Sequence, residues 1–422
     1  MKKRLITHIG TLGGIIENNA VGLKKGKEMD EFNTLSNAYV LIEDGIIKDF
    51  GKMENLPVTN NAEIINAEGG WVLPTYIDSH THLVFAQPRE EEFVMRIKGR
   101  SYEEIAEAGG GILNSAKKLQ LLTEDELYES ALNRLYEVIG YGTGAIEIKS
   151  GYGLTLIDEL KMLRVIRRLK QVSPIPIKAT FLGAHAIPTE YKNNRSEYIN
   201  LIIDQMLPQV AKDDLADYCD VFCDQGFFTP EETTQILIAA KKYHLKAKIH
   251  GNELGLTGGV QVAVAQNALS VDHLEYTSDV EIALLAESNT MPVGLPNCSF
   301  FLGIPYANGR KMIDAGLPFC LASDYNPGSS PNGRMGFVIS LACIQMKLTP
   351  NEAFNATTIN GAYALEMSNT HGSITKGKVA SLIITKPIPS LAFIPYHFGA
   401  DPISKVVIEG EIFTPPNQPK TN

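Results

Sequence analysis

The sequence has no excess of basic residues, no disulfide pattern and no long apolar run, and each absence excludes a class of protein. Its 38 Lys and Arg residues are outnumbered by 48 Asp and Glu, and a net charge of −10 argues against a nucleic-acid surface. The start, MKKRLITHIG, lacks an apolar run of signal-peptide length, and no later stretch is long enough to cross a membrane. The five cysteines are an odd, dispersed set. We therefore expect a cytoplasmic protein that binds neither nucleic acid nor membrane.

What the sequence does contain is a regular alternation of apolar strand-like segments and helical patterns. Capping motifs open several of the helices, for example Thr123 to Glu126 and Thr229 to Glu232, with the same device at Ser278 and Thr349. Eight strands alternating with helices predict an α/β protein, either a closed (β/α)8 barrel of the TIM type or an open doubly wound sheet. The eight apolar segments are residues 71–79, 143–149, 175–183, 218–223, 245–250, 268–273, 291–296 and 318–323.

The positions of the polar residues favour the barrel. They lie at or just beyond the carboxyl ends of the predicted strands, and in a closed barrel these ends form one ring around one cavity. An open sheet would spread them along an edge. The residues concerned are His80, His82, Lys149, Tyr152, His185, Asp224, His250, Glu253, His273, Asn297 and Asp324.

The two ends of the chain differ from its middle. Short strand-and-turn segments such as YVLIEDGIIKDFG and ISKVVIEGEIF replace the strand–helix alternation there. We expect residues 1–70 and 373–422 to form a small composite β-domain, and residues 71–372 to form the barrel.

The pair His80 and His82 stands at the end of the first predicted barrel strand. Alternate residues of a strand project to the same face, so both imidazoles can reach one metal ion. A single such pair is weak evidence, because it is also found among ordinary surface or core histidines. Here three further histidines, His185, His250 and His273, each end a strand of their own. Together they indicate a metal centre at the barrel mouth.

The order of these residues, and the stretches around them, resemble a known family. The chain resembles the amidohydrolase superfamily and, within it, the imidazolonepropionase family of histidine degradation. The resemblance implies a metal that activates water, hydrolysis of the ring amide of 4-imidazolone-5-propanoate to N-formimidoyl-L-glutamate, and a homodimer. The matching stretches are DSHTHLVFAQPREEEF, EAGGGI, IEIKSGYGL, FLGAHAIP, DVFCDQGFF, KIHGNELG, SVDHLEY and SDYNPGSSP.

The resemblance implies one metal ion per chain, held by His80, His82, His250 and Asp324. Three imidazoles and one carboxylate suit zinc or iron equally, and leave a position for water. Each ligand also has an ordinary interpretation, since a histidine after a strand can cap a loop and an aspartate before a turn can hold that turn. Two-metal relatives bridge their ions with a carbamylated lysine, for which Lys149 is the candidate here; we interpret Lys149 as structural or as an ion-pair partner.

Three residues are candidates for proton transfer. Glu253, three residues after His250, can take a proton from the attacking water and deliver it to the leaving nitrogen, or can merely support a ligand histidine. His273 can hold or deprotonate the same water, or can be a hydrogen-bonded barrel histidine. Asp324 can double as ligand and proton acceptor.

Substrate contacts are expected from several residues around the mouth. Arg89 offers a planar fork for the propionate carboxylate, with a salt bridge to Glu90, Glu91 or Glu92 as its alternative role. His185 is expected to bond the ring carbonyl, and the backbone amides of Gly328 and Ser329 a second polar edge. The complete expected set is Arg89, Tyr102, Tyr152, His185, Glu253, Asn326, Gly328 and Ser329.

Two rival functions remain. Another cyclic-amidine or deaminating hydrolase of the same superfamily, acting on a nucleobase-like ring, is disfavoured by Arg89, because a nucleobase has no carboxylate tail. A non-catalytic barrel stabilised by a metal is disfavoured by Glu253 and His273, which a structural metal would not require.

Overall fold

A computed structural model describes residues 2–17, 22–58, 61–100, 104 and 110–416. Its centre is a sheet of eight parallel strands, each paired with the next along the chain, in the order β6 to β13. The strands are β6 (Tyr76–Asp78), β7 (Thr143–Lys149), β8 (Ile177–Ala184), β9 (Tyr218–Cys223), β10 (Lys246–Gly251), β11 (Ser270–His273), β12 (Met291–Gly294) and β13 (Cys320–Leu321).

The sheet closes where the segments after its first and last strands meet. Thr81 bridges Tyr325 in parallel register. The His82 amide donates to the Tyr325 carbonyl (2.9 Å), and the Asp324 amide donates to the His80 carbonyl (3.0 Å). The predicted (β/α)8 barrel is confirmed, and its seam lies at His80, His82 and Asp324.

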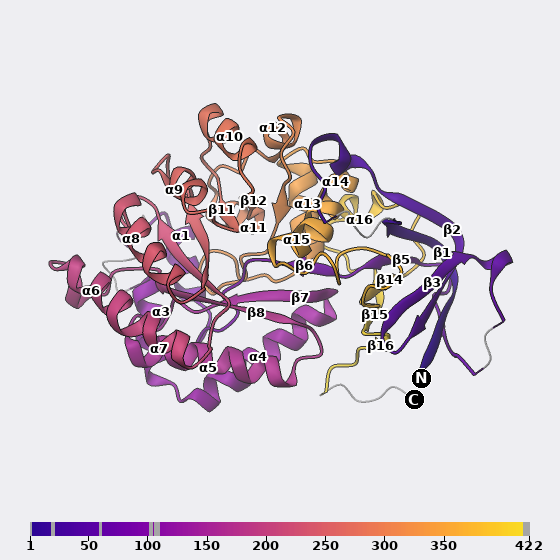
Figure 1. Cartoon of the computed structure of the whole chain (residues 1–422), viewed down its shortest axis with the longest axis horizontal. Helices are drawn as coiled ribbons and strands as arrows, with labels where there is room; N and C mark the ends of the chain where they lie inside the picture. The colour runs from indigo at the N-terminus through magenta and orange to yellow at the C-terminus, as the bar shows by residue number, and fades with distance from the viewer. Residues whose placement is uncertain (1, 18–21, 59–60, 101–103, 105–109, 417–422) are drawn as a thin grey trace.

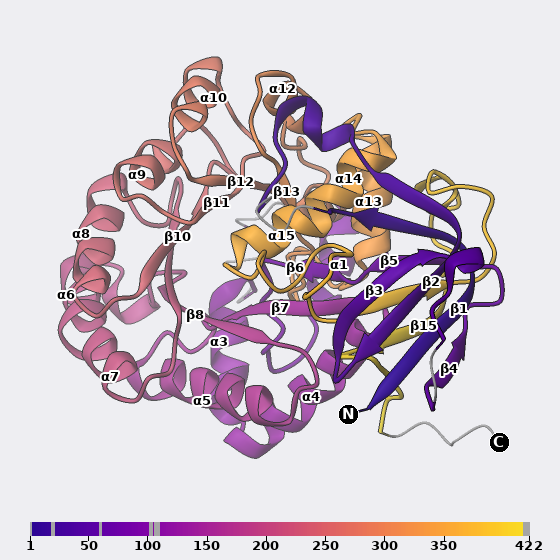
Figure 2. The same cartoon turned by 45° about the vertical axis from the view of Figure 1, so that its right-hand side comes forward.

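Helices surround the barrel, as Figure 2 shows for the arc from α5 to α12. All four predicted capping boxes are present, at Thr123, Thr229, Ser278 and Thr349. Within the described ranges, each helix falls short of the length and apolarity that a bilayer-spanning segment needs. The α-helices are α1 (Glu90–Ile97), α3 (Ile112–Leu121), α4 (Glu124–Gly140), α5 (Leu156–Val172), α6 (Arg195–Leu201), α7 (Leu207–Lys212), α8 (Pro230–Lys241), α9 (Gly259–Ala265), α10 (Asp279–Ala286), α11 (Pro296–Leu302), α12 (Gly309–Asp314), α13 (Met335–Ile344), α14 (Pro350–Thr357), α15 (Ile359–Ala364) and α16 (Phe393–Tyr396). Shorter helical turns are η1 (Gly26–Asp30), η2 (Met53–Asn55), η3 (Thr189–Tyr191) and η4 (Ile202–Met206).

Strands from both ends of the chain form a second, mixed sheet beside the barrel (Figure 1). Its order is β16-β15-β14-β5-β1-β2-β3, with β4 also paired to β1, so strands hundreds of residues apart lie side by side. The strands are β1 (Lys3–Ile15), β2 (Asn33–Glu43), β3 (Ile46–Lys52), β4 (Glu63–Asn66), β5 (Trp71–Pro74), β14 (Leu382–Thr385), β15 (Ile403–Ile408) and β16 (Glu411–Ile412).

The single strand predicted over residues 71–79 is two strands in two different sheets. β5 pairs with β14 and β1 in the mixed sheet, whereas β6 pairs with β7 in the barrel. The change of partner occurs at Thr75, whose amide donates to the Ser381 carbonyl (3.2 Å), while the next amide, that of Tyr76, donates to Gly142 (2.9 Å). An apolar run shows only that both parts are buried, so it does not reveal this change. The domain boundaries expected at residues 70 and 372 stay a prediction.

The close packing of α15 against β6 generates a stability prediction. A Cβ atom added at Gly361 would lie 2.7 Å from the Ile77 carbonyl oxygen, a backbone atom of the strand that leads to His80. Gly361→Ala should therefore lower the free energy of unfolding by about 1–3 kcal/mol, the usual cost of overpacking a core.

Urea denaturation measures this change, with Gly336→Ala as the matched control. A Cβ at Gly336, in α13, meets none of the described atoms within 4 Å. Alanine there should leave stability unchanged or raise it by up to about 1 kcal/mol, because alanine favours helices. Equal stability of the two variants would contradict the packing argument.

Candidate metal and active site

The histidines at the barrel seam converge with Asp324 on one point. His80 and His82 follow β6, His250 ends β10, and Asp324 follows β13. The Asp324 Oδ1 atom lies 3.5 Å from His80 Nε2 and 3.6 Å from His82 Nε2. His82 Nε2 and His250 Nε2 are 3.3 Å apart. All four side chains are buried, so residues distant in sequence form one enclosed donor group.

Buried carboxylates orient two of these imidazoles. Asp272 Oδ2 lies 2.6 Å from His80 Nδ1, and Asp220 Oδ2 lies 3.0 Å from His250 Nδ1. Since a carboxylate accepts, each Nδ1 must donate, which leaves the Nε2 lone pair facing the centre. Burial also lowers the pKa values of His80, His82 and His250, which keeps the rings neutral.

The donor set fits a metal ion. Three neutral imidazole nitrogens and one carboxylate oxygen are ordinary ligands of zinc and iron. His80 Nε2 is buried and has no hydrogen-bond partner among the described residues, as expected of an atom that binds something else. His80, His82 and Asp324 present ligand atoms within 4.8 Å of one another, and His250 belongs to two overlapping sets with His185 and His273.

Below the histidines, the barrel interior holds a layer of buried ion pairs. Lys149 Nζ lies 2.8 Å from Glu147 Oε1 and 2.7 Å from Asp220 Oδ2. Lys248 Nζ lies 2.9 Å from Glu147 Oε2 and 3.7 Å from Asp272 Oδ2. Burial opposes the charge of Lys149, but Asp220 and Glu147 outweigh it and raise its pKa. The ion-pair interpretation of Lys149 is confirmed.

Four members of this layer, Glu147, Asp220, Lys248 and Asp272, were not singled out by our sequence interpretation. A signal was present, because each is a charged residue inside one of the predicted barrel strands. Lys248 also precedes His250 by two residues, and therefore lies one step below it on the same face of β10. Charges in such positions are costly unless they are paired, which is a reason to expect partners on neighbouring strands.

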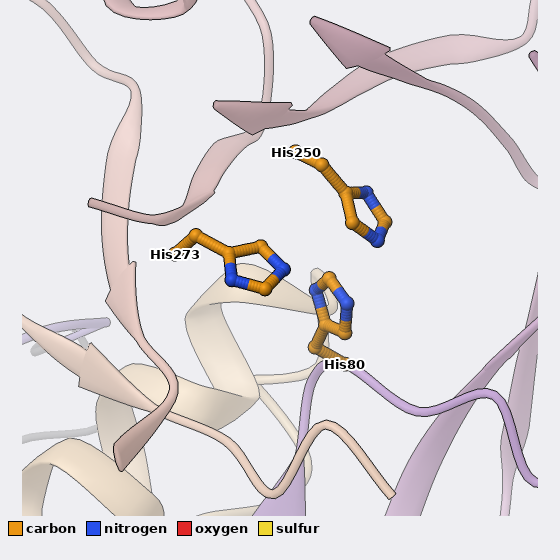
Figure 3. Close-up of side chains that lie close together, drawn as sticks. All are labelled: His80, His250 and His273. Carbon is orange, nitrogen blue, oxygen red and sulfur yellow. The ribbon is translucent and has the colours of Figure 1, made fainter. Parts of the chain in front are cut away.

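His273 and Glu253 form a charged pair beside the neutral histidines. Figure 3 shows the His273 ring directed toward His80 and His250. His273 Nε2 lies 3.6 Å from Glu253 Oε2 and its Nδ1 lies 3.5 Å from Glu275 Oε1. Burial lowers the pKa of His273, but these carboxylates outweigh it and hold the pKa well above the usual value. Burial raises the pKa of Glu253 to about 7, so this carboxyl can exchange a proton near neutrality.

The backbone at His273 is unusual. Its φ is +88°, a left-handed conformation that non-glycine residues rarely adopt, and Leu274 continues it at +64°. Asp324 is also left-handed, with φ of +53°. Backbone strain of this kind is concentrated at functional sites, where surrounding packing holds a side chain in an otherwise unfavourable direction.

The side chain of Asn326 stabilises the turn that follows Asp324 through four hydrogen bonds. Its Nδ2 donates to Asp324 Oδ2 (2.9 Å) and to Ser329 Oγ (2.8 Å). Its Oδ1 accepts from the amides of Gly328 and Ser329, both at 2.8 Å. Both amides that we expected to bind substrate therefore donate to Asn326 in this structure, and their contact with substrate stays a prediction.

A cavity lies beside the group formed by His80, His82, His250 and Asp324. Most of the residues that we expected to contact the substrate line this cavity. Arg89 lies against Gly328 so closely that a Cβ there would overlap the guanidinium group. Arg89 Nε also lies 3.7 Å from Glu92 Oε2. The arginine therefore faces the cavity and also lies beside one of the carboxylates that we considered as its salt-bridge partner. Tyr102 lies outside the described residues. The predicted residues that line the cavity are His82, Arg89, Tyr152, His185, His250, Glu253, His273, Asp324, Asn326, Gly328 and Ser329.

His185 presents an acceptor to this cavity. Its Nδ1 lies 2.9 Å from the Gly151 carbonyl oxygen and must donate to it. Burial lowers the pKa of His185 to about 3, so the ring is neutral and Nε2 carries a lone pair. In this tautomer Nε2 can accept an N–H from a ligand, and the hydrogen bond from His185 to a ring carbonyl stays a prediction.

Comparison with characterised proteins decides the family. The amidohydrolase family profile matches residues 71–413. The chain is 55% identical over 408 residues to the imidazolonepropionase of Christiangramia forsetii, covering 97% of this chain and 99% of that protein. It is 56% identical over 410 residues to that of Flavobacterium johnsoniae, covering 97% and 100%. The chain belongs to the imidazolonepropionase family of amidohydrolases. The resemblance seen in its motifs is confirmed.

Solved structures agree with the fold of this imidazolonepropionase-family protein. E. coli guanine deaminase matches with a TM-score of 0.75 and 14% identity, covering 99% of this chain and 100% of that one. The guanine deaminase of C. acetobutylicum matches with a TM-score of 0.72 and 16% identity, covering 98% and 100%. At such low identity the likeness establishes the architecture alone.

The carboxylate on His80 generates a prediction for metal binding in this imidazolonepropionase-family protein. Asp272→Asn keeps the shape of the side chain but removes the negative charge that orients Nδ1. We expect metal affinity to fall by about 10–100-fold, the usual effect of losing such a partner.

Competition with a chelator, followed by metal analysis, measures this loss. Asp204→Asn, an exposed carboxylate on η4, is the matched control and should bind metal like the wild type. If Asp272→Asn binds metal as tightly as the wild type, the 2.6 Å contact between Asp272 Oδ2 and His80 Nδ1 does not contribute to metal binding.

Proposed function

We propose that this protein hydrolyses the ring amide of 4-imidazolone-5-propanoate to N-formimidoyl-L-glutamate in histidine degradation. One observation carries the proposal: an arginine suited to a carboxylate and a donor group suited to a metal line the same buried cavity. Relatives more than half identical over almost the whole chain are named imidazolonepropionases, which supports this substrate. We also propose a cytoplasmic homodimer. Five unpaired cysteines are compatible with a reducing compartment.

The proposed metal ligands are His80, His82, His250 and Asp324, holding one zinc or iron ion per chain. When bound, such an ion supplies Lewis acidity, which makes water nucleophilic near neutral pH and polarises a carbonyl group. The protein contributes orientation: Asp272 and Asp220 fix the tautomers of His80 and His250 before any ion arrives.

Proton transfer is assigned to Glu253. With a pKa of about 7, its carboxylate can accept a proton from the attacking water and return it to the departing ring nitrogen. Glu253 and Glu275 raise the pKa of His273, which favours its protonated form. We assign it the stabilisation of negative charge as the carbonyl is attacked. Asp324 is held by Asn326 and remains the alternative proton acceptor.

Substrate orientation follows from the cavity. Arg89 is proposed to bind the propionate carboxylate, since a guanidinium fork matches a carboxylate in two hydrogen bonds. His185 accepts a ring N–H through Nε2, and Tyr152, whose ring centroid lies 5.3 Å from that of His185, forms an adjacent wall. Tyr102 stays a predicted contact. Asn326, Gly328 and Ser329 shape the floor beneath Arg89, where glycine leaves room for the guanidinium group.

A product assay tests this function against deamination. Ring opening keeps both nitrogens in the product, whereas a deaminase releases ammonia. Freshly generated imidazolonepropionate should lose its absorbance and give formimidoyl-glutamate by mass spectrometry without ammonia. Guanine and cytosine, supplied separately, should remain unchanged. Ammonia from a nucleobase, with the imidazolone untouched, would overturn the proposal.

Two variants separate substrate binding from chemistry. Arg89→Met should mainly raise KM, by an amount equivalent to roughly 2–5 kcal/mol, because a buried substrate carboxylate loses its partner. Glu253→Gln should lower kcat by roughly 10²–10⁴-fold, with metal content unchanged, because only the proton carrier is removed.

The pH profile of kcat gives a further check. A base must be deprotonated, so wild-type activity should rise with pH through about 7, and this rise should disappear in Glu253→Gln. If the rise of kcat with pH persists in Glu253→Gln, another residue carries the proton.

The Arg89 variant has its own contrary outcome. An unchanged KM in Arg89→Met would favour the alternative role of Arg89, the salt bridge with Glu92.

A further inference from the structure

A second group of donor atoms lies beside the proposed metal ligands. Cys298 Sγ lies 3.7 Å from Glu253 Oε1, and His273 Nε2 lies 3.6 Å from Glu253 Oε2. The three ligand atoms all lie within 4.8 Å of one another. They come from three successive connections of the barrel: Glu253 follows β10, His273 ends β11, and Cys298 lies in α11, after β12. The proposed reaction uses Glu253 and His273 but gives Cys298 no role.

The separations suit a single tetrahedral ion. Zinc bonds of about 2.0–2.2 Å to nitrogen and oxygen and about 2.3 Å to sulfur put neighbouring ligand atoms roughly 3.3–3.7 Å apart. Cys298 Sγ and His273 Nε2 lie 3.7 Å and 3.6 Å from the Oε1 and Oε2 atoms of Glu253, respectively, which falls within this range. A thiolate, an imidazole and a carboxylate together favour soft or borderline cations such as Zn²⁺ and Cd²⁺ over Mg²⁺.

His273 is the imidazole of this group, and a further carboxylate lies behind its ring. Glu275 Oε1 lies 3.5 Å from His273 Nδ1, and Ser299 Oγ donates to the same carboxylate oxygen at 3.3 Å. Nδ1 is buried and has no hydrogen-bond partner among the described residues, so Glu275 acts on the ring through its charge and proximity. The opposite nitrogen, Nε2, lies next to Glu253.

We propose that Glu253, His273 and Cys298 form an inhibitory site for a second soft divalent cation. Binding of the ion by Cys298 would release the thiol proton, and it would occupy the carboxylate that carries the proton. The site would fill only in metal excess, because a cation already held by His80, His82, His250 and Asp324 would repel the second one. The inhibition, though not the binding, rests on the proposed function of Glu253.

The test starts from protein that retains one metal equivalent after dialysis. Zn²⁺, Cd²⁺ and Mg²⁺ are then added separately. Equilibrium dialysis counts bound metal, ultraviolet difference spectra report a thiolate-to-Cd²⁺ charge-transfer band, and the imidazolone assay reports activity. Zn²⁺ and Cd²⁺ should add one further equivalent and inhibit, Cd²⁺ should produce the band, and Mg²⁺ should do none of these.

Cys298→Ser is the decisive variant, because it keeps a hydroxyl beside Glu253 and removes only the soft ligand. Relative to its own activity without added metal, it should need at least tenfold more Zn²⁺ for half-inhibition, and the Cd²⁺ band should vanish. Cys343→Ser, which removes a cysteine of α13 outside the cluster, should behave like the wild type.

Several results would overturn the site: a wild type that binds no second equivalent, a Cd²⁺ band that persists in Cys298→Ser, or equal inhibition by Mg²⁺. If Cys298→Ser fails to fold, wild-type stoichiometry and absorbance still decide. A wrong substrate assignment would look different, because the second equivalent and the band would appear without any hydrolysis of the imidazolone.

Discussion

The buried ion-pair layer inside the barrel is the interaction on which the site depends. Lys149 and Lys248 are completely enclosed, and each would cost several kcal/mol if it lost its partners. Glu147, Asp220 and Asp272, which lie on β7, β9 and β11, pair with them in the barrel interior. Asp220 and Asp272 also contact the Nδ1 atoms of His250 and His80. The same network of side chains therefore neutralises the buried lysines and orients two of the proposed metal ligands. Strand register supplies it, because residues two apart face the same interior.

This network divides the barrel mouth into two electrostatic halves. On one side, burial lowers the pKa values of His80, His82 and His250, and their rings stay neutral. On the other side, the carboxylates of Glu253 and Glu275 outweigh burial and raise the pKa of His273. Neutral imidazoles suit metal binding, and a charged acid–base pair suits proton transfer. Neighbouring groups pushed in opposite directions by their surroundings are typical of hydrolytic sites.

The cavity adds selectivity to this chemistry. The protein carries a net charge of −10, so an anionic substrate needs a local cation, and Arg89 supplies one at the cavity wall. Its position depends on Gly328, where any side chain would occupy the space of the guanidinium group. Asn326 in turn ties that turn to Asp324, so the groups proposed for metal and substrate share one rigid segment.

The sequence by itself determined the barrel, the four capping boxes and the gathering of polar residues around one mouth, because these follow from periodicity and from the ring of strand ends. The choice of His80, His82, His250 and Asp324 within that ring came from the resemblance to the family. Tertiary structure alone decided which nitrogen each histidine presents, since this depends on Asp220, Asp272 and the Gly151 carbonyl, which lie across strands. It also decided that the Gly328 and Ser329 amides are already used, and that the chain changes sheets at Thr75. These hydrogen-bond partners lie on segments that are distant in the sequence and meet only in the folded protein. Local sequence patterns therefore cannot predict them.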